Sequence, residues 1–324
     1  MFRILDEVKD AKTIGISGHI RPDGDCVGSC MAMALYLRGA MPQTRVDVFL
    51  EDVSDALRKN VAGTETIHRD FETDVDSYDV YLCLDCEKER LGDAMPFFAN
   101  AKKKINIDHH ISNKGSGDLN YIVPTASSTC ELVYNVLDPE LLTEPVARNL
   151  YIGMVTDTGV FKFSNTGRST MEIAGRLMEF GFDFPAIVRE VFCERSYVQQ
   201  QIMGRALLES VLFQDGRCIF SVIDRKTREF YRATSSDMDG IASELVNTTG
   251  VYCSIFLYET KPLTYKVSLR SNGQVNVAAI AGSFGGGGHA RAAGCTVNAG
   301  YHDIINNISA QIAAQLSGPA QHVS

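Results

Sequence analysis

Acidic residues and histidines directly follow several apolar runs of this chain. If those runs are parallel strands, their carboxyl ends lie at one edge of a sheet, and the polar side chains converge there although they are far apart in sequence. The groups are His19, Asp23 and Asp25 after residues 13–17, Asp85 after residues 80–84, Asp108, His109 and His110 after residues 104–107, and Asp157 after an apolar helical pattern.

Taken one at a time, these residues have ordinary structural explanations, because His19 could cap a turn and Asp23 and Asp25 are common turn residues. Together they indicate a metal site. Neighbouring carboxylates repel one another and need a cation or shared protons. Oxygen and imidazole ligands suit Mn²⁺, Mg²⁺, Co²⁺ or Zn²⁺. Six such ligands suit two ions about 3.5–4 Å apart that share a bridging carboxylate, an arrangement used for in-line attack on phosphorus.

The elements that must position these groups follow from the hydrophobic pattern. Apolar runs alternating with helical patterns predict an α/β fold with a parallel sheet covered on both faces. We expect strands at residues 13–17, 45–50, 80–84 and 104–107, and helices at 2–11, 26–38, 145–156, 168–179 and 184–208.

A second, smaller mixed α/β domain is predicted beyond residue 210. We expect strands there at residues 218–223, 251–258 and 263–269, and helices at 238–246, 275–284 and 302–316. The predicted division is a catalytic domain over residues 1–185, a helical linker over 186–209 and a substrate-binding domain over 210–318, with the active site in the cleft between the two domains.

Composition narrows the function classes. The 324 residues are 45% hydrophobic and carry a net charge of −9, which argues against a disordered chain and against a protein that coats long nucleic acid. The charged start of the chain is unlike a signal peptide, and no apolar stretch approaches the ~20 residues of a membrane span. Nine cysteines, an odd number, favour free thiols in a reducing cytoplasm.

Four motifs together resemble the DHH phosphoesterase superfamily, named for the triplet Asp108-His109-His110. They are residues 18–28 (GHIRPDGDCVG), the strand ending in Leu84-Asp85, residues 106–110 (NIDHH) and residues 153–159 (GMVTDTG). The resemblance extends over nearly all of the chain.

The resemblance implies a role for each of these residues. His19, Asp23 and Asp85 would hold one Mn²⁺, and Asp25, Asp85, His109 and Asp157 the other, with Mg²⁺ or Co²⁺ as alternatives. His110 would contact the scissile phosphate or assist the leaving group. Asp108 would orient the imidazoles by hydrogen bonding, without touching the metal.

The second domain resembles the DHH-associated C-terminal domain of oligoribonuclease-type members. Its candidate substrate-binding residues are Arg270, Ser271, Gly286, Gly287, Gly288, His289 and Arg291. Consecutive glycines let backbone N–H groups approach an anion, and Arg and His side chains add donors.

The subgroup that matches this length and glycine motif combines oligoribonuclease and 3'-phosphoadenosine-5'-phosphate (PAP) phosphatase activities. The expected enzyme releases 5'-mononucleotides from very short RNA, with PAP as a second substrate. A cyclic dinucleotide such as cyclic di-AMP, or linear pApA or pGpG, is the nearest alternative. Inorganic pyrophosphatase and a non-catalytic nucleotide-binding module are weaker ones. The resemblance alone suggests a homodimer.

Overall fold

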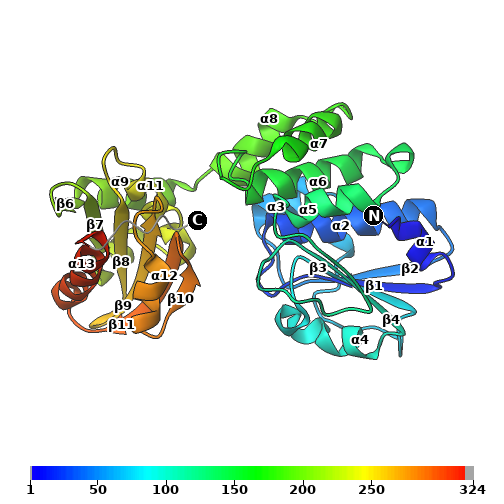
Figure 1. The fold of residues 1–324 in the computed structure, drawn as a ribbon, viewed down its shortest axis with the longest axis horizontal. Coiled ribbons are helices and arrows are strands. Elements are labelled where there is room, and N and C mark those ends of the chain that lie inside the picture. The colour runs from blue at the N-terminus through cyan, green and yellow to red at the C-terminus, as the bar shows by residue number, and fades with distance from the viewer. Residues whose placement is uncertain (1, 318–324) are drawn as a thin grey trace. The chain divides into compact units, whose positions relative to one another are not determined.

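The computed structural model describes residues 2–317 and contains two compact units, one ending at Glu194 and the other starting at Arg195. Each unit has its own β-sheet with helices packed on it (Figure 1). The predicted α/β fold class is therefore confirmed. Within residues 2–317, no helix is both long and apolar enough to cross a membrane.

The first unit contains a five-stranded sheet in the order β2-β1-β3-β4-β5, with every neighbouring pair parallel. Its strands are β1 (Thr13–Ser17), β2 (Arg45–Phe49), β3 (Val80–Leu84), β4 (Lys103–Asp108) and β5 (Leu119–Ile122). Its helices are α1 (Ile4–Val8), α2 (Gly24–Ala40), α3 (Asp55–Asn60), α4 (Met95–Asn100), α5 (Thr129–Val136), α6 (Glu144–Asp157), α7 (Arg168–Met178) and α8 (Phe184–Ile187). Short helical turns occupy Thr64–Thr66, Lys88–Arg90, Gly92–Ala94, Pro139–Leu141 and Val188–Cys193.

Both faces of this sheet are covered, which explains why its central strand β3 is apolar throughout. All five residues of β3 are buried. Helices α2, α5 and α6 lie on one face and α4 on the other (Figure 1). Alternate side chains therefore enter two different cores: Ile14 and Leu82 pack with the first group of helices, and Tyr81 packs with Phe98 of α4.

Two glycines allow α2 and α6 to approach closely. A Cβ on Gly28 would lie 2.6 Å from the backbone oxygen of Asn149, and a Cβ on Gly153 would lie 2.9 Å from Oδ1 of Asp25. Real side chains cannot occupy such space, so glycine is needed at both positions. The close contact brings the start of α2, with Asp25, near the end of α6, with Asp157.

The second unit contains a mixed six-stranded sheet in the order β10-β11-β9-β8-β7-β6, in which only the β7–β8 pair is parallel. Its strands are β6 (Val211–Phe213), β7 (Cys218–Ile223), β8 (Cys253–Lys261), β9 (Thr264–Ser271), β10 (Gly287–His289) and β11 (Ala292–Asn298). Its helices are α9 (Tyr197–Leu208), α10 (Arg225–Tyr231), α11 (Ile241–Val246), α12 (Val277–Ser283) and α13 (Tyr301–Ser317), with a short turn at Ser236–Met238.

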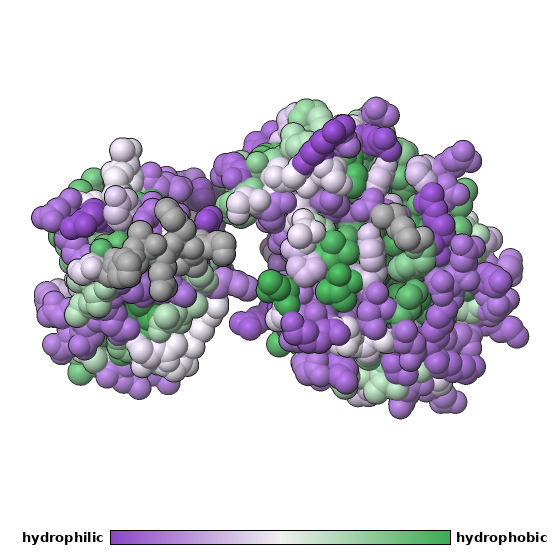
Figure 2. Space-filling model, viewed as in Figure 1, coloured by the Kyte–Doolittle hydropathy of each residue, from purple (hydrophilic) through white to green (hydrophobic). Residues whose placement is uncertain are grey.

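The helices of the second unit are also divided between the two faces of its sheet. Alternate residues of β8 and β9 pack with α12 and α13 in one core. On the opposite face, α9 and α11 form a second core with Ile219 of β7 and Phe256 of β8. Hydrophilic residues are spread over much of the visible surface, with smaller hydrophobic areas between them, as Figure 2 shows.

The prediction of a single helix over residues 184–208 is wrong. The chain becomes extended at Glu194, and α9 begins afresh after Ser196. The hydroxyl of Ser196 accepts a hydrogen bond from the amide of Gln199, and the Gln199 side chain accepts one from the amide of Ser196. This capping box favours a new helix start over continuation of the old one. The two units meet in sequence within this break.

Candidate active site

His19 lies just after β1 and is 5% exposed. Its Nδ1 is 2.9 Å from the carbonyl oxygen of Ile20, so the other ring nitrogen is left for the site. That nitrogen, Nε2, lies 3.4 Å from Asp85 Oδ2 and 3.7 Å from Asp23 Oδ1. Burial by itself would lower the pKa of His19, but the contacts with Asp23 and Asp85 outweigh burial and raise that pKa to about 11.

Asp23 is the N-cap of α2, as its turn-like sequence suggests. Its Oδ1 accepts hydrogen bonds from the amides of Asp25 and Cys26, both at 3.1 Å. Burial acts to raise the pKa of Asp23, but the contact with His19 and these amide bonds hold the pKa below its usual value. Asp23 therefore stays ionised and faces His19, as a ligand of a shared cation would.

Asp85 follows β3 and occupies the centre of the site. Its backbone has φ of +62°, a conformation that non-glycine residues seldom adopt and that is common at functional sites. Oδ2 faces His19, while Oδ1 accepts a hydrogen bond from the Thr129 hydroxyl at 2.9 Å and lies 3.7 Å from His109 Nε2. Burial, together with the charge of Asp25, raises the pKa of Asp85 well above its usual value.

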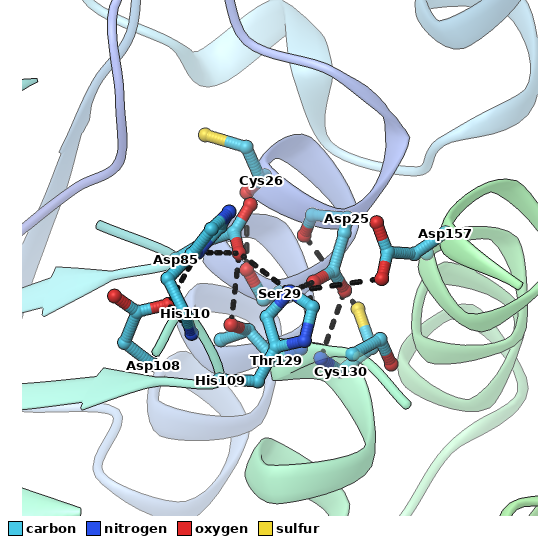
Figure 3. Close-up of polar contacts among 12 residues, drawn as sticks. Asp25, Cys26, Ser29, Asp85, Asp108, His109, His110, Thr129, Cys130 and Asp157 are labelled. Atoms are coloured by element: carbon cyan, nitrogen blue, oxygen red, sulfur yellow. Dashed lines mark hydrogen bonds and ion pairs between the residues drawn. The ribbon is translucent and has the colours of Figure 1, made fainter. Parts of the chain in front are cut away.

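Three carboxylates face one nitrogen of His109. Its Nε2 lies 3.6 Å from Asp157 Oδ2, 3.7 Å from Asp85 Oδ1 and 3.9 Å from Asp25 Oδ2. Figure 3 shows Asp25 and Asp157 on one side of the ring and Asp85 on the other. Burial and the charges of Asp25 and Asp23 raise the pKa of Asp157 to about 8. The site thus holds more negative charge than its own side chains neutralise.

The start of α5 is a feature that sequence reasoning missed. The amides of Thr129 and Cys130 donate to the Asp25 carboxylate at 2.6 and 2.9 Å. Unpaired amides at a helix N-terminus are well suited to hold a carboxylate in a fixed orientation. A signal for this helix was present in the sequence: Ser128 caps it by accepting from the amide of Glu131, a spacing typical of a helix start.

Asp108 and His110 form a pair beside the carboxylates. Asp108 Oδ1 lies 2.7 Å from His110 Nδ1, and its Oδ2 accepts from the Asn113 side chain at 2.6 Å. Burial acts to raise the pKa of Asp108, but the bonds from His110 and Asn113 outweigh it and lower the pKa. An ionised carboxylate only accepts, so Nδ1 of His110 carries the hydrogen and Nε2 is left for the substrate.

These side chains fit a divalent metal. Two ligand groups that the structure brings together are Asp25, His109 and Asp157, and Asp85 with His109 and His110. A third combines His19 and Asp85 with Cys26, a residue that sequence reasoning did not select. Burial raises the pKa of the Cys26 thiol, which favours the protonated form that binds metal poorly. The donor set is therefore mainly carboxylate and imidazole, as expected.

The predicted residues of the second unit lie near one end of its sheet. The register of β9, β11 and β10 puts Arg270, Ala292 and His289 opposite one another in a row. Gly287, Gly288 and His289 form the edge strand β10 instead of a free loop. This strand was not expected because glycine and alanine have low β-propensity, and its pairing depends on distant residues.

The other predicted residues of this unit differ in their surroundings. Ser271 is buried, and its hydroxyl accepts from the amides of Gly273 and Val275, so it shapes the turn after β9. A Cβ on Gly286 would collide with the backbone oxygen of Gly294 and with the Cα and Cβ atoms of Cys295. This glycine therefore packs against β11. The Arg291 side chain is exposed and lies next to Gly273.

Two family models match the chain. Residues 13–154 match the DHH family, N-terminal domain, and residues 216–318 match the DHHA1 domain. Between them the two matches account for most of the chain, which therefore belongs to the DHH family and carries a DHHA1 domain. The resemblance noted in the sequence is confirmed.

Individual proteins resemble the chain over nearly its full length. The bifunctional oligoribonuclease and PAP phosphatase NrnA of Bacillus subtilis (strain 168) is 26% identical over 293 residues, covering 88% of this chain and 89% of the relative. The protein of the same name from Thermus thermophilus is 29% identical over 313 residues, covering 91% and 88%. The crystal structure of an exopolyphosphatase-related protein from Bacteroides fragilis is 25% identical, with a TM-score of 0.86 and coverage of 96% and 94%.

Proposed function

We propose that this protein is a metal-dependent phosphohydrolase that degrades very short RNA to 5'-mononucleotides and removes the 3'-phosphate of PAP. One observation carries the proposal: His109 Nε2 lies within 3.9 Å of carboxylate oxygens from Asp25, Asp85 and Asp157. The two relatives named as oligoribonuclease and PAP phosphatase support the choice of substrate.

Two divalent ions would occupy the site, Mn²⁺ in first place and Mg²⁺ or Co²⁺ as substitutes. His19, Asp23 and Asp85 would hold one, and Asp25, Asp85, His109 and Asp157 the other. The ions would supply positive charge to the scissile phosphate and a water made nucleophilic at neutral pH. Asp85 has one oxygen toward His19 and the other toward His109, which suits a shared ligand.

Side chains of both units would then position the substrate. His110 is anchored to Asp108 through Nδ1, so Nε2 faces the substrate, where in its protonated form it donates to a phosphoryl oxygen or gives a proton to the leaving oxygen. The hydrogen bonds of Asp108 with His110 and Asn113 fix the ring. In the second unit, Arg270 and His289 are the proposed phosphate contacts, because their register puts them in one row.

Purified protein supplied with Mn²⁺ is tested against pApA, a five-nucleotide RNA, PAP, cyclic di-AMP and pyrophosphate, with products separated by chromatography. We expect mononucleotides from pApA and from the RNA, and AMP from PAP. Cleavage restricted to cyclic di-AMP or to pyrophosphate would contradict the proposed substrate while leaving the metal site intact.

Substitutions inside and outside the proposed site should differ in their effect on turnover. Asp85→Ala and His109→Ala are expected to abolish turnover, whereas Asp93→Ala, at an exposed position after β3, should leave it unchanged. His289→Ala should weaken substrate binding and retain the metal, measured by elemental analysis. Loss of metal in His289→Ala would contradict the division of roles between the two units.

A further inference from the structure

One face of the second sheet is covered by helices only in part. On the face that carries α9 and α11, the helices pack against β7 and β8 in a core that includes Ile219 and Phe256. Helix α11 also reaches β9 at Arg270, whose Nε donates to the Ser243 hydroxyl at 3.3 Å. The residues of β9 and β11 on the same face are partly or fully exposed. We call these residues the open face: Lys266, Ser268 and Arg270 of β9, and Ala292, Gly294 and Thr296 of β11.

The strand register arranges the open face in rows. Arg270 is opposite Ala292, Ser268 is opposite Gly294, and Lys266 is opposite Thr296. Because residues directly opposite in a sheet point to the same face, these six residues share one surface. The first row continues to His289 on β10, and the second to Gly287. The proposed phosphate contacts Arg270 and His289 thus stand at one end of the open face.

Lys266 stands at the other end of the open face. It lies four residues from Arg270 along β9, which corresponds to about 14 Å along an antiparallel strand. Lys266 is exposed, and its Nζ lies 6.0 Å from the ring centroid of Tyr258 on β8. The lysine amine therefore lies beside the ring of Tyr258 and, at an exposed position, is available to a ligand.

The floor between the two cations is made of small residues. Ser268 and Gly294 form the row between Arg270 and Lys266, and Ala292 lies opposite Arg270. These small residues project little above the backbone, so a ligand chain can lie close to the sheet. Asp239 is the acid near both cations, and burial raises its pKa although Lys266 and Arg270 act in the opposite direction. Burial of Asp239 therefore works against the negative charge that would compete with a ligand phosphate.

We propose that the open face is a track for the sugar-phosphate backbone of RNA longer than a dinucleotide, with Lys266 contacting a phosphate beyond the one held at Arg270. Two cations spaced along one extended strand suit a single-stranded backbone, whose phosphates repeat along its length. The inference rests on the proposed function and gives it a length preference: the dinucleotide ends before Lys266, and a longer RNA reaches it.

The test uses Lys266→Gln in the full chain, because glutamine keeps part of the aliphatic stem and removes the charge. KM and kcat are measured for pApA and for a five-nucleotide RNA. We expect KM for the longer RNA to rise about three- to tenfold, and KM for pApA to stay the same. The slope of log KM against log salt for the longer RNA should fall by about 0.7, the value for one phosphate contact on a single strand. Lys226→Gln, at an exposed lysine on α10, is the matched control.

The proposed track would be contradicted if Lys266→Gln changed KM equally for pApA and for the longer RNA, or if it left KM for the longer RNA unchanged. A second measurement, binding of a labelled, non-hydrolysable five-nucleotide RNA, separates this result from a failure of the proposed function. If the wild-type protein hydrolyses neither substrate but Lys266→Gln still weakens RNA binding, the track holds and the proposed function fails. If the wild-type protein hydrolyses both and Lys266→Gln leaves binding unchanged, the track fails alone.

Discussion

The hydroxyl of Thr129 donates a hydrogen bond to Asp85 Oδ1 at 2.9 Å, although the two residues are 44 positions apart. The amide of the same threonine donates to Asp25 Oδ2 at 2.6 Å. One residue at the start of α5 thus orients two carboxylates that belong to α2 and to the end of β3. Thr129 therefore holds two of the proposed metal ligands in place without being one itself.

Thr129→Val should weaken metal binding by about 10- to 100-fold, because a ligand that loses its outer partner is less well oriented. Valine has nearly the same shape and lacks the hydroxyl. Isothermal titration with Mn²⁺ measures the change. Thr170→Val is the matched control, since this buried threonine also donates to a carboxylate, Glu131, at 2.9 Å. Equal loss of metal affinity in both variants would show a general loss of stability instead.

Asp108→Asn should lower kcat by about 10- to 100-fold and leave the metal content unchanged, because the ring of His110 loses its anionic partner. The replacement amide also places a donor against either His110 or Asn113. Kinetics on pApA measure kcat, and elemental analysis of the purified variant measures the metal content. Asp118→Asn serves as control, because Asp118 accepts from the amide of Lys104 at the start of β4. Loss of metal in Asp108→Asn would make Asp108 a ligand or a structural support of the metal site.

Metal affinity should increase with pH up to about 8 in the wild-type protein. Burial, with Asp25 and Asp23 nearby, raises the pKa of Asp157 to about 8, so below that pH a proton must leave before a metal can bind. The same raised pKa means that the metal-free protein loses stability as the pH rises from about 4 to about 8, because over that range the folded chain keeps a proton on Asp157 that the unfolded chain releases.

Asp157→Asn removes this carboxyl group and is the matching variant. Its metal affinity should be lower throughout and should increase less steeply between about pH 6 and pH 8. Titrations with Mn²⁺ in a series of buffers measure both proteins. An identical pH slope in the two would show that Asp157 carries no proton that the metal displaces.

The positions of the proposed metal ligands could be predicted because they depend on few elements. Asp85 and His109 directly follow strands, and the parallel order of the sheet brings strand ends together whatever the exact packing. Thr129 and Asn113 could not be found this way. Their roles depend on how α5 and the loop after His110 fold back on the site, which is set by tertiary packing.

The second unit was less predictable for a related reason. Its central strands are rich in β-branched and aromatic residues and were found, whereas β10 and β11 begin in a run of glycine and alanine. Pairing with β9 stabilises them, and this pairing cannot be inferred from local sequence. Gly287 and Gly288 were therefore expected in a loop, and the open face was not foreseen.

Asp79, just before β3, offers a test of stability that is independent of the metal site. Its Oδ2 accepts from the amides of Lys12 and Thr13 at 2.8 and 3.1 Å, and its Oδ1 accepts from the Lys102 amine at 2.7 Å. The Lys102 bond, with these amides, lowers the pKa of Asp79 to about 2 from the usual 3.8. The carboxylate thus links the start of β1 to that of β3.

Asp79→Asn should reduce the free energy of unfolding by about 1–2 kcal/mol at neutral pH, because the amide accepts more weakly and its nitrogen faces other donors. The pKa of Asp79 is lower in the folded chain than in the unfolded chain. The stabilisation by its carboxylate is therefore complete above about pH 4 and is lost as the pH falls toward about 2. Urea unfolding from pH 7 down to about pH 3 should therefore show wild type and variant converging. Asp76→Asn, at an exposed acid three residues earlier, should match wild type throughout. A difference between wild type and Asp79→Asn that persists unchanged at low pH would mean that packing, and not the carboxylate charge, links the two strands.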